Sequence, residues 1–189
     1  MRIVNLMEDT EGSRGCAFEH GLCFYIETKS HKILMDTGAS ELIIANAKKK
    51  GIRLSKVDTV VLSHGHYDHG GGLPAFLKLN PKAKVYMQKT AYEEYYSEHQ
   101  DGHVHYIGLT PEVRDLEQII YADREYKIDE ELSLFSGIGN DYPIPSGNRE
   151  LKKKTEKGLV QDDFLMNSVW WCRRTGGESF FRVVRIMGY

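Results

Sequence analysis

The chain has 189 residues, a formal net charge of −2 at pH 7 and 41% hydrophobic residues. This length suffices for one domain with a substantial core and gives no reason to expect a second. The nearly balanced charge argues against an electrostatic nucleic-acid binder. No stretch approaches the roughly 18 apolar residues of a membrane helix. We therefore expect neither a nucleic-acid partner nor a membrane association.

The cysteines are sparse and odd in number, at Cys16, Cys23 and Cys172. The first residues, Met1–Asn5, lack the long apolar run of a signal peptide. Both features favour free thiols in a reducing cytoplasm. Cys16 or Cys23 as a metal ligand is an open alternative, but a small buried side chain is the favoured interpretation.

The chain begins with a pattern typical of strands. Arg2–Met7 is a predicted first strand, Leu22–Thr28 a second and Lys32–Met35 the returning one, with a turn at Ser30 and His31. Short apolar segments joined by such a turn predict an antiparallel hairpin or meander.

A helix is predicted after this meander. Ser40 is the expected N-cap, Leu42–Ala47 provides a buried side, and Lys48–Lys50 places positive charge in the last turn. Gly51 is a plausible left-handed terminator.

The next segment, Val57–Leu62, is apolar and β-branched, as in a buried strand, and leads directly into a loop of metal-ligand side chains. His64 and His66 are two positions apart, so in an extended segment they point the same way and can grip one ion. Asp68 and His69 are adjacent, so their side chains diverge from that pair and can reach a second ion.

The residue types of this loop define its preferred metals. Imidazoles with a carboxylate suit zinc, iron or manganese rather than a thiolate-type structural zinc site. Two ions about 3.5–4 Å apart could clamp a reacting oxygen. A histidine-rich surface loop without function is the alternative, which the density of the cluster and its strand-then-glycine setting disfavour.

Downstream, short elements alternate with loops. We expect a helix at Gly72–Leu79 stopped by Asn80-Pro81, and a tyrosine-rich helix at Thr90–Tyr96. Further expected elements are strands at Lys84–Met87, Val104–Ile107, Ile119–Tyr121 and Leu132–Phe135, a loop at Asp141–Asn148 and a charged surface segment at Lys152–Lys157.

Other histidines have two open interpretations. His103 and His105 share a face if extended and form a group with His99, so metal binding is conceivable, although a surface role is favoured. His20 either lies near the metal loop as a hydrogen-bonding group or is a surface turn residue.

The loop closely resembles the His-x-His-x-Asp-His motif of the metallo-β-lactamase superfamily, and the resemblance extends from roughly Asn5 to Phe164. The branch it resembles is named for 7,8-dihydropterin-6-methyl-4-(β-D-ribofuranosyl)aminobenzene-5′-phosphate synthase. The resemblance includes Gly12-Ser13-Arg14-Gly15, Glu19-His20-Gly21-Leu22, Leu34-Met35-Asp36-Thr37-Gly38 and Asp162-Asp163-Phe164.

The resemblance implies an α/β (α+β) fold, the αββα sandwich, of which this chain holds largely the first half. It implies that His64, His66, Asp68 and His69 bind one or two Zn²⁺ ions, with iron or manganese as alternatives. Asp36 would orient a histidine or water near the ions; a turn aspartate bonded to its own backbone is the alternative.

The implied activity is hydrolysis of a small-molecule substrate by metal-activated water, at an ester, thioester, lactam or phosphodiester bond. Asp68 would also act in catalysis, by orienting the water or moving its proton. The alternative is a catalytically inactive metal-binding fragment, because His105 is the last histidine of the chain.

The sequence departs from the resembled branch after Phe164, where a further acidic or histidine-bearing segment is expected. With allowed codon choices, another reading frame can give His-Glu-Gln-Arg-Leu-Val-Val for Leu165–Cys172 and Ser-Gly-Cys-Ala-His-Asn-Gly-Ile for Phe181–Tyr189. We therefore expect a partial domain at 1–164 and an aberrant, frameshifted tail at 165–189, with a genuinely divergent short terminus as the alternative. An incomplete second half would leave an apolar sheet face uncovered, with self-association or poor solubility as the consequence.

Overall fold

The computed structural model describes residues 1–12, 15–114, 116–136, 146–174 and 177–181, with side chains as far as Ser168. Ser13, Arg14, the cysteine side chain at position 172, most of the expected loop at 141–148 and the end of the chain lie outside these residues. Among the described residues, no helix is long and apolar enough to cross a membrane.

The central element is a six-stranded sheet of order β1-β2-β3-β4-β5-β8. Its first three strands pair antiparallel, and β3, β4, β5 and β8 pair in parallel. The strands are β1 (Arg2–Met7), β2 (Cys23–Glu27), β3 (Lys32–Met35), β4 (Thr59–Val61), β5 (Lys84–Met87) and β8 (Ile119–Tyr121). The sequence predicted all six, four of them with these bounds.

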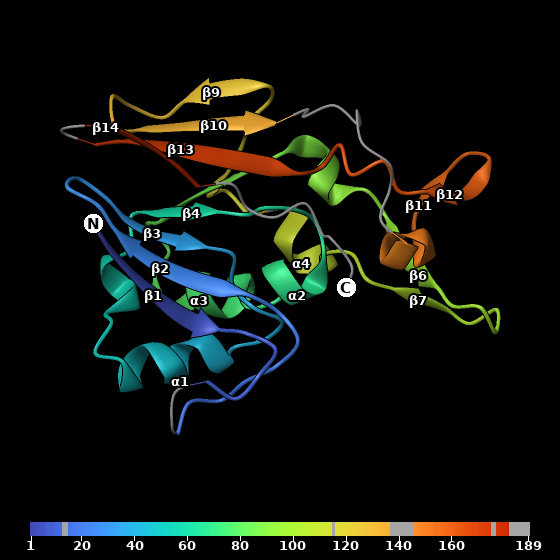
Figure 1. Cartoon of the computed structure of the whole chain (residues 1–189), viewed down its shortest axis with the longest axis horizontal. Coiled ribbons are helices and arrows are strands. Elements are labelled where there is room, and N and C mark those ends of the chain that lie inside the picture. Colours follow the sequence, from blue (N-terminus) through green and yellow to red (C-terminus); the bar gives the residue numbers. More distant parts are fainter. Residues whose placement is uncertain (13–14, 115, 137–145, 175–176, 182–189) are drawn as a thin grey trace.

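Two helices cover one face of this sheet (Figure 1), α1 (Leu42–Lys49) and α3 (Leu73–Leu79). Ile43 of α1 and Phe76 of α3 are fully buried in the core below the sheet. The Ser40 hydroxyl accepts the Leu42 N–H at 3.2 Å, but the N-cap is Glu41, one residue later than predicted. Gly51, with a φ of 69°, follows the end of the helix as predicted.

A second sheet, of order β14-β13-β10-β9, lies over the opposite face (Figure 1). It comprises β9 (Glu125–Lys127), β10 (Leu132–Ser136), β13 (Ser168–Arg174) and β14 (Gly177–Phe181). Leu132 and Leu134 of β10 pack on Ile26, Ile33 and Met35 of the first sheet. Helix, sheet and sheet thus form three successive layers of the expected α/β sandwich.

We expected one apolar face of the first sheet to be uncovered. This expectation is wrong, because the second sheet covers that face. The apolar face of β2 and β3 meets β10, because β10 presents apolar residues inward and the segment Ser168–Arg174 pairs with it antiparallel. Self-association stays a prediction, but it loses this part of its physical basis.

A third, small sheet projects at one side (Figure 1), with the order β12-β11-β6-β7. Its strands are β6 (Tyr95–Glu98), β7 (Val104–Tyr106), β11 (Leu151–Thr155) and β12 (Gly158–Gln161). The expected helix at Thr90–Tyr96 is wrong: a 3-10 turn at Lys89–Tyr92 gives way to β6. Tyr95 is 1% exposed, and such burial of an aromatic side chain favours a strand over local helix propensity.

The charged segment expected on the surface contains β11. Its lysines pair with acidic groups of neighbouring segments, as Lys152 does with Glu98 and Lys154 with Glu94. These cross-strand ion pairs let a lysine-rich sequence form a strand without an apolar face.

Candidate metal centre

The loop after β4 delivers its histidines at the carboxyl ends of the parallel strands. His64 and His66 are 1% and 4% exposed, and their ring centroids are 4.7 Å apart. His66 is extended, with φ −95° and ψ 149°, and precedes the short helix α2 (Tyr67–Gly70). Asp68 and His69 lie on α2.

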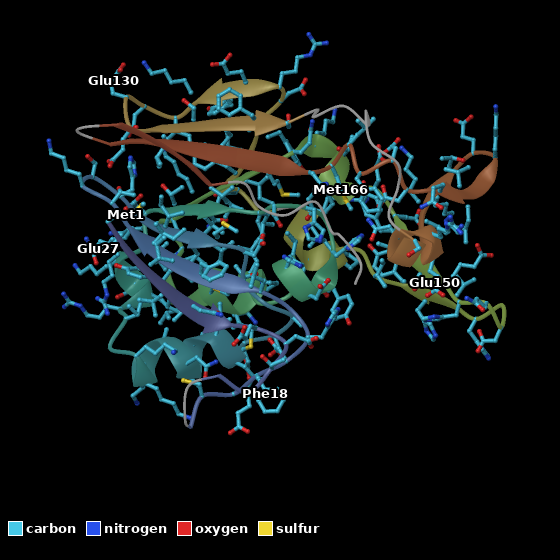
Figure 2. All side chains as sticks on the ribbon, in the orientation of Figure 1. Met1, Phe18, Glu27, Glu130, Glu150 and Met166 are labelled. Carbon is cyan, nitrogen blue, oxygen red and sulfur yellow. The ribbon has the colours of Figure 1, made fainter. Side chains whose placement is uncertain are left out.

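Gly65 allows the loop to take this path. A Cβ at this position would lie 2.0 Å from the Ala91 carbonyl oxygen, closer than any side chain tolerates. The Gly65 N–H faces the Met166 sulfur at 3.4 Å, and the Ser168 N–H donates to the Ser63 carbonyl at 2.7 Å. Met166 is labelled in Figure 2. Residues assigned from the sequence to an aberrant tail therefore contact the metal loop, and the boundary near 165 stays a prediction.

His64, Asp68 and His69 come together as one group. One ligand atom from each lies within 4.8 Å of the other two. The His64 ring centroid is 4.0 Å from that of His69 and 4.7 Å from that of His66. The four predicted side chains therefore lie close together, but the structure groups His64 with Asp68 and His69 rather than with His66 alone.

Asp36 lies next to Ser63 and His69, fully buried and with a left-handed φ of 57°. Its Oδ1 accepts the Ser63 N–H at 2.8 Å, and its Oδ2 contacts both the Ser63 hydroxyl at 2.8 Å and His69 Nδ1 at 2.7 Å. The carboxylate therefore fixes the His69 ring with Nε2 directed to the other side, which is the geometry expected of a carboxylate that orients a ligand.

Asp162 is a site residue that the sequence reasoning did not assign. Its Oδ1 accepts the Phe164 N–H at 2.8 Å, while its Oδ2 lies 4.0 Å from His66 Nε2. Burial raises the pKa of Asp162 to about 6. The signal available in the sequence was the Asp162-Asp163-Phe164 motif, which contributed to the resemblance without a role being given to it.

Three buried polar atoms at this location have no partner among the described residues: His64 Nε2, His66 Nε2 and Asp162 Oδ2. Buried polar atoms are nearly always hydrogen-bonded, because leaving one unsatisfied costs about 1–3 kcal/mol. Imidazole nitrogens and a carboxylate oxygen that converge without protein partners fit a zinc, iron or manganese ion.

The protonation states of His64 and His66 also fit. Burial lowers the pKa of His66 to about 4, and burial together with the neighbouring histidines lowers the pKa of His64 well below its ordinary value. Both rings are therefore neutral at pH 7, the form that binds metal. For His69, burial alone would lower the pKa, but Asp36 and Asp68 raise it to about 10. The site thus favours positive charge beside Asp68.

Of the other candidate histidines, His20 lies near the metal site, and His99 and His103 do not belong to it. His20 Nε2 is 3.6 Å from Asp68 Oδ2, so His20 lies next to the site. His99 pairs with Glu150 at 3.3 Å and the side chain of His103 is 75% exposed; neither belongs to the ligand group found among the described residues. Cys23 is fully buried with a free thiol, as expected for a small core residue.

This fold and site define a class: an α/β sandwich with a histidine- and aspartate-rich metal loop at the carboxyl ends of parallel strands. The sequence profile of the metallo-β-lactamase superfamily matches residues 17–158. The chain belongs to the metallo-β-lactamase superfamily.

Individual relatives support this membership. An uncharacterized protein of Methanocaldococcus jannaschii is 26% identical over 174 residues, covering 87% of this chain and 65% of that protein. The 7,8-dihydropterin-6-methyl-4-(β-D-ribofuranosyl)-aminobenzene-5′-phosphate synthase of the same organism is 38% identical over 84 residues, covering 41% of this chain and 29% of that protein.

A solved structure is similar over almost the whole chain. It is described as a metal-dependent hydrolase of the β-lactamase superfamily, with 27% identity and a TM-score of 0.75, and the match covers 93% of this chain and 62% of that one. The chain therefore spans less than two thirds of the length of these relatives.

Proposed function

We propose that this chain is a metal-dependent hydrolase whose ions are bound by His64, His66, Asp68 and His69, with Asp162 as a further ligand. The observation that carries the proposal is that His64 Nε2, His66 Nε2 and Asp162 Oδ2 are buried without hydrogen-bond partners, with the His66 ring 4.7 Å from that of His64 and its Nε2 4.0 Å from Asp162 Oδ2. Zn²⁺ is the proposed ion, and iron or manganese would suit the same donor atoms.

Two close pairs of ligand groups support two neighbouring ion positions. His66 Nε2 lies 4.0 Å from Asp162 Oδ2, and His69 Nε2 lies 3.3 Å from Asp68 Oδ2. The His64 ring is near both histidines, at 4.7 Å from His66 and 4.0 Å from His69 between centroids. One or two ions are therefore expected per chain.

An ion held here lowers the pKa of water towards about 7 and polarises an electrophile. The chain's own residues then orient the reactants. Asp68 has a largely buried carboxylate, 13% exposed, at the side of the site where His20 lies, and it can accept a hydrogen bond from the attacking water and take its proton. Asp36 holds His69 so that its Nε2 faces Asp68.

The proposed substrate is a small molecule with an ester, thioester, lactam or phosphodiester bond. Superfamily membership supports hydrolysis, and the relatives' names, a hydrolase and a synthase, do not narrow this range. A cytoplasmic location, without nucleic-acid or membrane partners, belongs to the same proposal.

The test is turnover of four chromogenic substrates, one for each bond type, by protein stripped with a chelator and reloaded with Zn²⁺, Mn²⁺ or Fe²⁺. We expect hydrolysis of at least one substrate only after reloading, and a loss of at least about 100-fold in His66→Ala. His103→Ala is the matched control, an exposed histidine beside an aspartate outside the site, and should keep full activity. Hydrolysis that needs no metal would contradict the proposal.

A second candidate is a metal-binding chain without turnover. It is favoured by the stretch after His105 up to Tyr189, which contains no further histidine. Stoichiometric metal binding with no hydrolysis in any of the four assays would support this candidate over the first.

A further inference from the structure

The segment Glu19–Leu22 is anchored through its first residue, Glu19, to the turn between β3 and α1. The Glu19 carboxylate accepts the N–H groups of Ala39 and Ser40 at 3.1 and 3.0 Å and the Ser40 hydroxyl at 2.7 Å. These hydrogen bonds join the segment to the turn between β3 and α1, which borders the site. A charged acceptor with three donors holds a loop far more firmly than surface contacts would.

The next residues touch Asp68 directly. Gly21 has a φ of 143°, and a Cβ there would lie 2.2 Å from the Asp68 carbonyl oxygen. The Leu22 N–H donates to the same oxygen at 3.3 Å. Only glycine permits this approach, and the result is that the segment and α2 are in backbone contact at a proposed ligand.

The contacts of Glu19, Gly21 and Leu22 place His20 next to the Asp68 carboxylate. Its Nε2 lies 3.6 Å from Asp68 Oδ2, and His69 Nε2 lies 3.3 Å from the same oxygen. The distance of 3.6 Å between His20 and Asp68 is too long for a good hydrogen bond. Both distances are close to the separation of about 3.4 Å between two ligands of a tetrahedral zinc ion with bonds of about 2.0–2.1 Å.

The two histidines share a further feature at their other ring nitrogen. His69 Nδ1 is held by Asp36 at 2.7 Å, and His20 Nδ1 faces Asp9 Oδ1 at 3.3 Å. Metal-binding histidines typically direct one nitrogen to a carboxylate and the other to the ion. His20 and His69 therefore present the same carboxylate–imidazole arrangement to the Asp68 carboxylate.

We propose that His20 is a third protein ligand of the ion bound by Asp68 and His69, with Asp9 as the residue that orients it. This inference rests on the proposed metal centre and adds a ligand from the first loop of the chain. The His20 side chain is 68% exposed, so this end of the site is open to solvent and to a substrate. An open coordination side is what a catalytic zinc site requires.

The experiment is a Zn²⁺ titration against a chromophoric chelator, with metal-free wild-type protein and the variants His20→Ala, His69→Ala, Asp9→Asn and His103→Ala. His20→Ala should weaken the same binding step as His69→Ala, by more than about 10-fold, and Asp9→Asn by a smaller factor. His103→Ala should bind like the wild type. The thermal midpoints of metal-free wild type and His20→Ala should coincide, because an exposed side chain is removed.

The outcomes separate this inference from the function on which it rests. A His20→Ala curve that superimposes on the wild type while His69→Ala binds more weakly would overturn the inference and leave the metal centre intact. Wild-type protein that binds no Zn²⁺ would overturn both. Weakened binding in His20→Ala and His69→Ala alike would support the inference, whether the wild type holds one ion or two.

Discussion

At the scale of single residues, Asp36 connects the backbone of the metal loop to one of its ligands. Its two oxygens bind the Ser63 N–H, the Ser63 hydroxyl and His69 Nδ1, all within a fully buried environment. A non-glycine residue at positive φ is conformationally strained, and these contacts compensate for the strain at Asp36. Among such residues, Asp and Asn tolerate the left-handed region best.

Asp36→Asn should therefore preserve the fold and weaken the metal centre. The amide has the same shape but loses the negative charge that holds the His69 N–H, so we expect the Zn²⁺ affinity to fall about 10–100-fold in a chelator competition. Asp129→Asn is the matched control, since Asp129 also contacts a histidine ring, His31, at 2.6 Å but outside the site. Equal affinities of Asp36→Asn and wild type would contradict the role given to Asp36.

Gly65→Ala tests the close approach in the metal loop. Its Cβ would meet the Ala91 carbonyl at 2.0 Å, so the loop must shift, and we expect a loss of about 1–3 kcal/mol in the free energy of unfolding in urea. Gly51→Ala has open space around its Cβ and a positive φ, and it should lose only about 1 kcal/mol. A Gly65→Ala variant as stable as Gly51→Ala would show that the loop is not confined.

At the scale of elements, two turns link the sheets on the side away from the metal. His31, in the β2–β3 turn, contacts Asp58 at 2.8 Å and Asp129, in the β9–β10 turn, at 2.6 Å. Glu131 accepts the N–H groups of Lys29 and Ser30 at 3.2 and 2.9 Å. The second sheet is therefore tied to the first by charge as well as by apolar contact.

This link predicts a pH-dependent stability. Burial alone would lower the pKa of His31, but Asp58 and Asp129 raise it above the ordinary value. A histidine with a raised folded-state pKa stabilises the protein fully below its unfolded pKa of about 6.5 and loses that effect as the pH rises through the folded value. The difference in unfolding free energy between wild type and His31→Gln should be largest near pH 5.5 and shrink towards pH 9. A difference in unfolding free energy that grows with pH would contradict the stabilising role given to protonated His31.

Local patterns in the sequence were sufficient for the elements of the first sheet. Lys32–Met35 and Ile119–Tyr121 are short apolar segments bounded by polar residues, and they occur as predicted. The helix expected at Thr90–Tyr96 fails because burial of Tyr95, a tertiary effect, decides the structure there. The contact of Asp162 with His66 joins residues far apart in the chain, so no local pattern could assign it.

At the scale of the whole molecule, the metal centre lies where the layers meet. The loop after β4 contacts the end of the second sheet through Ser63 and Ser168, and it contacts the segment before α4 (Pro111–Arg114) through the bridge of His66 with Gly108. An ion at this junction would bind ligands from the loop after β4, from α2 and from Asp162 together. Metal binding and global stability should therefore be coupled.

Zn²⁺ should raise the thermal midpoint of the wild-type protein, and a chelator should lower it again. At 100 times the dissociation constant, one bound ion stabilises by about 2.7 kcal/mol. Differential scanning fluorimetry with and without Zn²⁺ measures the shift, and His64→Ala should abolish most of it. An equal shift in wild type and His64→Ala would place the binding outside this centre.

The central claim is that His64, His66 and their neighbours bind metal, and the most direct measurement is the metal content per chain by inductively coupled plasma mass spectrometry. We expect one or two equivalents of Zn²⁺ on reloaded wild-type protein, and a loss of at least one equivalent in the double variant His64→Ala/His66→Ala. A wild-type metal content equal to that of a folded double variant would contradict the account.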